Sequence, residues 1–358
     1  MIWRKPLAAR SLGGVAATGR FVLVGDRALN DTADAFLCLD AESGRTVWSL
    51  RYPAPGKLDY GNTSRATPLI VGDRVFLFGA MGHLTCVDLA SGRQLWQKDV
   101  RAEFDITARL PWGLCGSPLF IDDQLVLQPG GNEGSLVALD PATGDTIWAT
   151  EGGPPSHGSL IAATLGGRRQ LVGHDATSLG GWDAADGKRL WTIVPEFPND
   201  FNVPTPVVHD GRLIVATENN GTRLFCFDRD GRIIKQPQAV REEIAPDVHS
   251  PVVVGNRLFI VHQGLFCLDL RNPLEVVWKG TDPAFSSHTS LIASGNRLLV
   301  ITDSGELLLV DALADRLTIA GRTHLLPDET GMYAHPALVG DRLYLRGNSE
   351  VVCISIGN

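Results

Sequence analysis

The sequence predicts an all-β fold, an eight-bladed β-propeller with four antiparallel strands in each blade. The first observation is a unit of strand, tight turn and strand, seen most clearly as GSLVALDPATGDTIW from Gly134 to Trp148. Its apolar run lacks helical periodicity, Pro141 and Gly144 prevent a helix through the turn, and its last residues are β-formers. The second observation is the spacing of these units, whose turn residues lie 41 residues apart at the shortest (228 to 269) and 52 at the longest (88 to 140). The turn residues are Asp40, Asp88, Asp140, Asp183, Asp228, Asp269, Asp311 and, in a degenerate copy, Ser355.

The turn itself explains why the aspartate recurs. Its carboxylate can accept hydrogen bonds from backbone N–H groups two or three residues on, and Gly144 supplies the positive φ that such a turn needs. A residue needed once at an active site would not recur in seven units. We therefore interpret the repeated aspartates as turn clamps and the repeated tryptophans as packing plates between blades.

A second marker lies about 22 residues before most of these turns and predicts two further strands per unit. It is a Ser/Thr-Pro start, an apolar strand, a short polar turn and another apolar strand, as in TPLIVGDRVFLFG from Thr67. The strands are almost continuously apolar, as expected where neighbouring blades cover both faces of a sheet. We expect a single domain over residues 1–358, with blades at about 12–50, 65–98, 115–150, 157–193, 203–236, 248–280, 288–321 and 333–356 together with 1–6.

The two ends of the chain are predicted to close the ring of blades. The last segment, GNSEVVCISIGN, ends after its third strand and lacks the fourth strand, which ends in tryptophan in five copies. Ile2 and Trp3 supply that strand, so pairing residues 1–6 with the last blade would remove two exposed edges. Lys235 and Ile319 occupy the tryptophan position in the fifth and seventh copies, which we expect to be less regular.

Composition limits the function. The net charge of −8 leaves no basic stripe for nucleic acid, and no apolar run of about 18 residues could span a membrane. The first residues contain no signal-peptide core, so we expect either a cytoplasmic protein or one whose leader has been removed.

The cysteines are expected to be free thiols. Five of them, Cys38, Cys86, Cys226, Cys267 and Cys353, occupy the same position two residues before the turn residue, where other copies carry small or apolar residues. This pattern indicates buried packing in separate blades. Cys115 lies outside this position, and we expect it to react first.

The repeated string LxLDxxxGxxxW, seen as LCLDAESGRTVW and TCVDLASGRQLW, resembles the repeat of propellers of the pyrroloquinoline-quinone (PQQ) type. That group includes quinoprotein alcohol dehydrogenases and the non-enzymatic BamB-like proteins of outer-membrane assembly. The chain most resembles the BamB-like proteins that consist of the propeller alone, which implies an exported, periplasmic location. It departs from the dehydrogenases because it is much shorter and has neither an adjacent Cys-Cys pair nor a CxxCH haem-attachment motif.

The candidate binding site lies on the face of the variable loops, since loop variation on a constant scaffold is where function usually resides. The long loops are residues 26–34, 52–64, 98–114, 129–133, 195–203 and 236–247. Polar and aromatic residues just before each innermost strand are predicted to line the channel mouth on this face, either as a ligand site or as strand caps that bind water. They are Arg65, Trp112, His157, Asn202, His249, His288, Tyr333 and His335.

No metal site and no catalytic residue are predicted. The four mouth histidines come from different blades and lack zinc spacing. Asp26, Asn30, Asp31 and Asp34 offer oxygen ligands for calcium, yet the segment lacks the glycine and closing glutamate of an EF-hand, so we interpret it as a solvated acidic loop.

The predicted function is a non-catalytic binding or scaffold protein of the cell envelope, monomeric, with a protein, peptide or glycan partner. The alternative is a small PQQ-dependent oxidoreductase with the quinone and calcium in the channel, and a third hypothesis is a lyase or hydrolase built on the mouth histidines. Trp112 could form the aromatic floor and Arg65 the cation of a PQQ site. No cofactor is expected, because the mouth positions offer no pair of carboxylates for calcium.

Overall fold

The computed structural model describes residues 1–286, 288–326 and 331–357. Within these residues the strands form eight four-stranded antiparallel sheets, which confirms the predicted all-β propeller class. The chain divides into two compact units, residues 1–155 with 332–358, and residues 156–331. The single domain expected from the sequence stays a prediction. Each unit is described by itself.

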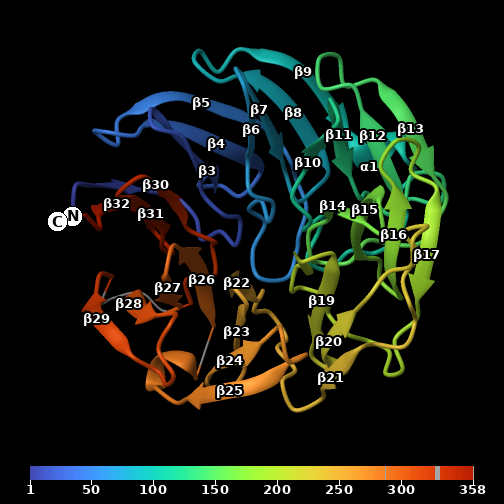
Figure 1. Cartoon of the computed structure of the whole chain (residues 1–358). Coiled ribbons are helices and arrows are strands. Elements are labelled where there is room, and N and C mark those ends of the chain that lie inside the picture. The colour runs from blue at the N-terminus through green and yellow to red at the C-terminus, as the bar shows by residue number, and fades with distance from the viewer. Residues whose placement is uncertain (287, 327–330, 358) are drawn as a thin grey trace. The chain divides into compact units, whose positions relative to one another are not determined.

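The first unit contains blades 1, 2, 3 and 8, in each of which neighbouring strands are joined by hydrogen bonds in the order given (Figure 1). The strands are, for blade 1, β2 (Ala16–Ala17), β3 (Phe21–Arg27), β4 (Ala33–Asp40) and β5 (Thr46–Pro53); for blade 2, β6 (Leu69–Val71), β7 (Arg74–Phe78), β8 (His83–Asp88) and β9 (Gln94–Asp99); for blade 3, β10 (Leu119–Ile121), β11 (Gln124–Leu127), β12 (Leu136–Leu139) and β13 (Thr146–Thr150); and for blade 8, β30 (Ala337–Val339), β31 (Arg342–Arg346), β32 (Glu350–Ser355) and β1 (Trp3–Pro6).

The second unit contains blades 4 to 7, each formed by four strands that are consecutive in sequence. The strands are, for blade 4, β14 (Ile161–Leu165), β15 (Arg168–His174), β16 (Leu179–Asp183) and β17 (Arg189–Ile193); for blade 5, β18 (Val207–His209), β19 (Arg212–Thr217), β20 (Gly221–Phe225) and β21 (Ala239–Arg241); for blade 6, β22 (Val252–Val254), β23 (Arg257–Val261), β24 (Leu265–Asp269) and β25 (Glu275–Gly280); and for blade 7, β26 (Thr289–Ser294), β27 (Arg297–Thr302), β28 (Glu306–Asp311) and β29 (Ile319–His324).

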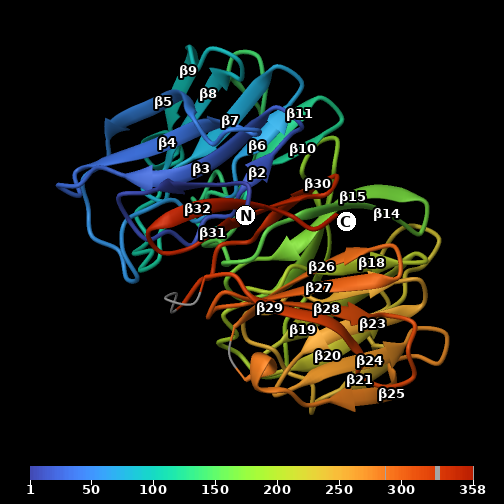
Figure 2. The ribbon, with the colours of Figure 1, turned by 90° about the vertical axis from the view of Figure 1, so that its left-hand side faces the viewer.

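The N-terminal strand completes the last blade, as predicted. β1 pairs antiparallel with β32, with Trp3 opposite Cys353, and the N-terminus lies beside β32 in Figures 1 and 2. Trp48 faces Cys38 and Trp96 faces Cys86 in the same way. Trp3 therefore occupies the tryptophan position of blade 8.

Hydrophobic cores lie between adjacent blades. In the first unit, Leu23 of blade 1 packs in one cluster with Leu77 of blade 2. In the second unit, Val172 of blade 4 packs with Leu213 of blade 5. Both faces of a blade are thus covered, which explains why all seven residues of β3 are buried.

Some of the repeated tryptophans contact the turn of the next blade, whereas Trp148 and Trp191 donate to glutamines of their own blades. Trp3 Nε1 donates to the carbonyl of Ala41 at 3.0 Å, and Trp48 Nε1 donates to Leu89 at 2.8 Å, in each case to the residue after the turn aspartate. The turn glycine also lies against the indole, since a Cβ at Gly92 would come within 2.5 Å of Trp48 Cγ. The repeated tryptophan and glycine therefore form one interblade contact, in agreement with the predicted scaffold role.

The turn aspartates act as predicted. Asp140 Oδ1 accepts the N–H of Ala142 at 2.6 Å, and Gly144 has a φ of +80°. In blade 1, hydrogen bonds from the Ser43 hydroxyl and backbone N–H lower the pKa of Asp40.

Blade 5 departs from the predicted pattern. Its fourth strand, β21, begins at Ala239, beyond the expected end of the blade at residue 236, and the loop expected over 236–247 contains this strand. Ile234 N donates to Cys226 O and Gln238 N to Leu224 O, so the three residues 235–237 bulge out between these bonds. Pro237 has no N–H to give to the sheet, which interrupts the strand before it can continue.

Blade 7 has a longer turn than expected. Asp311 N donates to Thr318 O, seven residues on, whereas Asp40 N donates to Arg45 O, five residues on. Gly321 therefore lies opposite Leu309, and the assignment of Ile319 to the tryptophan position was wrong.

Helical structure in residues 1–286, 288–326 and 331–357 consists of short segments. The loop expected over 98–114 contains α1 (Val100–Glu103), whose N-cap Asp99 accepts the N–H groups of Arg101 and Ala102, and a 3₁₀ turn, η1 (Pro283–Phe285), precedes β26. No helix in the described part of the chain has the length and apolar character needed to cross a membrane.

Candidate functional site

The eight residues predicted to line the channel mouth divide equally between the two units. In the first unit, Arg65 is buried and its guanidinium makes hydrogen bonds within its own loop. Its guanidinium donates to the carbonyls of Asp59, Gly61 and Thr63 at 2.7 to 2.9 Å. Burial lowers the pKa of Arg65. Arg65 therefore holds the 59–63 loop in place, and its guanidinium is not presented as the cation of a ligand site.

Trp112 and the neighbouring Cys115 lie together before β10. Both are half-buried, and Cys115 Sγ lies 3.7 Å from the carbonyl of Trp112. Burial raises the pKa of Cys115 to about 11, and the charge of Arg65 lowers it only in part. The thiolate is therefore rare near neutral pH, which argues against the expectation that Cys115 reacts first.

Tyr333 and His335 precede β30, and both side chains are exposed. The Arg10 guanidinium lies 5.0 Å from the centre of the Tyr333 ring, a cation–π contact between the first and last blades. The carbonyl of His335 accepts the N–H of Val15 at 2.9 Å. This segment thus joins blade 8 to blade 1 and also displays an aromatic and an imidazole group.

The acidic loop weighed as a calcium site has its carboxylates engaged within the protein. Arg27 is 1% exposed, and it pairs with Asp34 at 2.6 Å and also with Asp31. It donates further to the carbonyls of Asn62 and Ala54. The loop is an arginine-centred ion-pair cluster that ties residues 28–34 to residues 54–62.

In the second unit, the structure brings two of the predicted histidines together. The rings of His249 and His288 are stacked with centroids 5.4 Å apart and an angle of 24° between their planes. His157 is half-buried, and burial lowers its pKa. Among the described residues, no group of three or more His, Cys, Asp or Glu side chains is placed to hold a metal ion.

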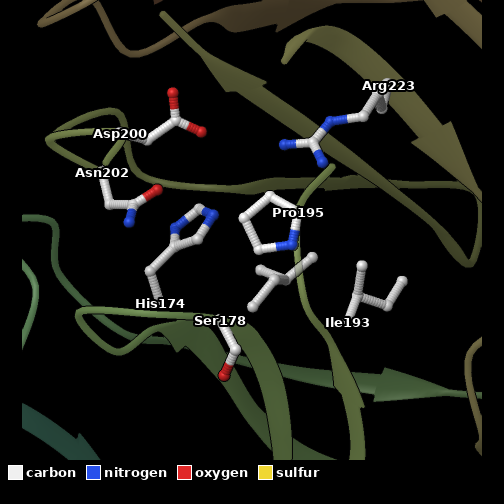
Figure 3. Close-up of a pocket in the computed structure, with 8 residues that line it drawn as sticks. His174, Ser178, Ile193, Pro195, Asp200, Asn202 and Arg223 are labelled. Carbon is white, nitrogen blue, oxygen red and sulfur yellow. The ribbon is translucent and has the colours of Figure 1, made fainter. Parts of the chain in front are cut away.

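Asn202 leads to a pocket that the sequence analysis missed. The pocket lies between blades 4 and 5, beside the segment that joins β17 to β18, and Figure 3 shows the residues that line it. Its cavity of about 10 Å³ is close to the space that one water molecule needs. The pocket is lined by His174, Ser178, Leu179, Ile193, Pro195, Asp200, Asn202 and Arg223.

His174 lies at the end of β15 and points into this pocket (Figure 3). Burial is the largest cause that lowers the pKa of His174, to about 4, and the charge of Arg223 adds to it. The imidazole is therefore neutral at physiological pH and offers one N–H donor. A histidine at the end of an apolar strand was the only sequence signal for this position.

Arg223 reaches the pocket from β20, where its neighbours on the strand are buried. Its Nη2 donates to Thr217 Oγ1 at 3.1 Å, while its Nε is buried without a partner. Burial lowers the pKa of Arg223, because removing the guanidinium from water disfavours its charged form. A charged residue inside the apolar run GTRLF was the sequence signal here.

The segment over the pocket is held rigidly and exposes apolar side chains. Asn220 Oδ1 accepts the N–H of Phe197 at 3.0 Å, and Glu218 Oε1 accepts that of Phe201 at 3.1 Å. Nevertheless, Val194 is 74%, Phe197 55% and Phe201 47% exposed. We call residues 194–201 the aromatic loop.

The repeat, the docked tryptophans and the rigid loops define a class, the eight-bladed propellers whose strand-turn-strand units are locked by tryptophan. A family model described as the outer membrane protein assembly factor BamB matches residues 1–148 and 132–246, more than half of the chain. The chain belongs to this family, in agreement with the resemblance of its repeat.

Individual relatives fall into two groups. The outer membrane protein assembly factor BamB of Shewanella oneidensis is 25% identical over 352 aligned positions, which cover 81% of this chain and 84% of the relative. The lanthanide-dependent methanol dehydrogenase of Methylorubrum extorquens is 31% identical over 63% of this chain, but the match covers only 38% of that enzyme. The crystal structure of BamB from Moraxella catarrhalis is similar in fold, with a TM-score of 0.68, 15% identity and 98% of both chains covered.

Proposed function

We propose that this protein is a non-catalytic binding protein of the periplasm that takes a protein partner during the assembly of outer membrane proteins. Family membership supports the assembly context, since the relative matched over most of both chains carries the name of an assembly factor. A peptide or glycan partner and the monomeric state remain predictions from the sequence.

The aromatic loop is the observation that carries the proposal for a protein partner. Apolar side chains that are exposed on a loop with a fixed backbone lose little conformational entropy when a partner covers them. Exposed phenylalanines at fixed positions are typical of binding hot spots rather than of random surface. Glu196 and Glu218 add negative charge beside them, so the surface favours a partner with apolar and basic side chains.

Site-specific photo-crosslinking in the native host tests the proposal. A crosslinking amino acid at Phe197 should trap a subunit of the outer membrane protein assembly machinery. The matched control is Ile147, which is similarly exposed (49%) but lies on the outer strand β13. Equal crosslinking from both positions, or none from position 197 in folded protein, would contradict the proposal.

A quinone-dependent oxidoreductase is the second candidate, favoured by the identity with the methanol dehydrogenase. PQQ would supply hydride or electron acceptance, and its carboxylates need cations and a metal. The residues of this chain do not fit that role: Arg65 is occupied by loop carbonyls, and the described residues offer no metal-holding cluster. Saturable PQQ binding with calcium, together with dye-linked alcohol oxidation by purified protein, would reverse this preference.

A further inference from the structure

Arg223 is a buried cation with an incomplete set of partners. It is 9% exposed, and the described hydrogen-bond acceptor for its five N–H donors is the Thr217 hydroxyl. Asp200 acts on it at longer range. The Asp200 oxygens accept instead from Asn219 N and Asn220 Nδ2, both at 2.7 Å. A buried charge without a close counter-ion is costly, so its retention needs an explanation.

The surroundings of the guanidinium suit a small planar anion with an apolar body. Figure 3 shows Arg223 and His174 directed toward the same space, with Asn202 beside them. Ile193 and Pro195 form an apolar wall of that space. The cavity, about 10 Å³, has room for about one water-sized group, so a carboxylate would place one oxygen inside it and the other at its mouth.

We propose that this pocket binds the carboxylate group of a ligand whose apolar body rests on the aromatic loop. Arg223 donates to the two carboxylate oxygens through its fork of N–H groups, the geometry for which guanidinium and carboxylate are matched. His174 and Asn202 line the same pocket and border the bound carboxylate. Ile193 and Pro195, which form the apolar wall of the pocket, are placed to contact the carbon skeleton.

Asp200 limits the affinity, because its negative charge also lines the pocket. The lining is therefore close to neutral at physiological pH, with one arginine, one aspartate and a neutral histidine. This gives two substitutions of opposite sign. Arg223→Gln removes the attraction, and Asp200→Asn removes the repulsion while keeping an oxygen that can accept from Asn219.

The inference goes beyond the proposed function and does not depend on it. A protein partner could cover the aromatic loop without placing a carboxylate in the pocket, and a free carboxylic acid could bind without any partner. The two proposals therefore fail separately, one in the crosslinking experiment and the other in the ligand titration.

The test is a titration of the full chain with N-acetylleucine and with N-acetylleucinamide, followed through the NMR signals of the His174 imidazole. The acid should shift these signals to saturation, whereas the amide, which lacks the charge, should not. Arg223→Gln should weaken binding of the acid at least tenfold, and Asp200→Asn should tighten it severalfold. Arg229→Gln, which removes an exposed arginine outside the pocket, is the matched control and should leave binding unchanged.

A third ligand separates the sources of the carboxylate. N-acetylaspartamide with a free side-chain carboxylate would bind as well as N-acetylleucine if the natural source is an acidic side chain, and more weakly if it is a main-chain carboxyl or a free acid. Equal shifts with N-acetylleucine and its amide, or no saturable shift with either, would overturn the proposal. This comparison uses the wild-type protein and needs no variant. If Arg223→Gln does not fold, Arg223→Lys keeps the charge without the fork and should still weaken binding of the acid.

Discussion

Arg27 in the first unit and Arg223 in the second are both buried arginines, but their surroundings differ. Arg27 pairs with Asp34 and Asp31 and donates to three loop carbonyls. Arg223 has one hydroxyl acceptor and a buried Nε without a partner. A buried cation whose donors the fold satisfies is a structural element, whereas a buried cation with unsatisfied donors beside a cavity needs another explanation, such as the ligand proposed above. Burial alone would not have separated the two.

Stability measurements give the largest expected contrast between these arginines. Arg27→Met leaves Asp34 buried without its partner and should lower the free energy of unfolding by about 3 to 5 kcal/mol. Arg223→Met removes a charge that the fold does not neutralise, so the change should stay within about 1 kcal/mol or be a gain. Urea denaturation of both variants, with exposed Arg229→Met as the control, measures the difference. Equal losses at positions 27 and 223 would show that Arg223 is structural as well.

The pH dependence of stability should report on His174, which lines the same pocket. Its folded pKa of about 4 lies below the ordinary value of 6.5, so unfolding takes up a proton between these values. Above pH 6.5 His174 is neutral in both the folded and the unfolded protein, and the free energy of unfolding keeps its full value. As the pH falls toward 4, the unfolded protein binds a proton that the folded protein does not, and stability is lost. Between pH 6.5 and 5 the free energy of unfolding should fall by about 1.5 kcal/mol. His174→Gln should lose less stability between pH 7 and 5 than the wild-type protein does. If the urea midpoints of the two proteins fall equally over this range, His174 does not cause the pH dependence.

A matched pair of glycines extends the comparison from charges to packing. Gly92 and Gly72 both have positive φ, +70° and +59°, but Gly92 lies against Trp48 and the space beside Gly72 is open. Alanine at either position carries the backbone penalty of roughly 1 kcal/mol. Gly92→Ala should cost about 1 to 3 kcal/mol more, because its Cβ would overlap the indole. Thermal unfolding of the two variants tests whether the tryptophan contact determines the turn.

The smallest effect concerns the thiols and would not change stability. All six cysteines are free. Burial raises the pKa of Cys38 to about 12 and those of Cys86, Cys115 and Cys267 to about 11, and it also raises that of Cys353. Cys226 is half-buried beside the irregular fourth strand of blade 5, so alkylation of the native protein should begin there. Mass spectrometry that finds Cys115 labelled first would restore the original expectation.

The fold could be predicted because the same strand-turn-strand pattern recurs in blade after blade. The position of Trp3 opposite Cys353 followed from copies such as Trp48 opposite Cys38, although hundreds of residues separate the two ends. The pattern failed where a local feature overrode it. Pro237 displaced β21, and the two extra residues in the Asp311 turn moved the tryptophan position to Gly321.

The pocket could not be predicted from the repeat, because its residues occur once. His174, Asp200 and Arg223 come from a strand end, a connection and the middle of an apolar strand, and only the packing of blade 4 against blade 5 brings them together. The candidate Asn202 was identified because its position before an innermost strand does recur. A charged side chain within an apolar strand was visible in the sequence, but Arg27 shows the same pattern in a structural role.

The pairing of β1 with β32 also has a consequence for how the protein is made. Trp3 is synthesised 350 positions before its partner Cys353. At about 5 to 20 residues per second, the first strand waits roughly 20 to 70 seconds for the edge that it must join. Throughout that time an indole and an unpaired strand are accessible to other chains, so a nascent chain of this design depends on chaperones until its last blade is complete.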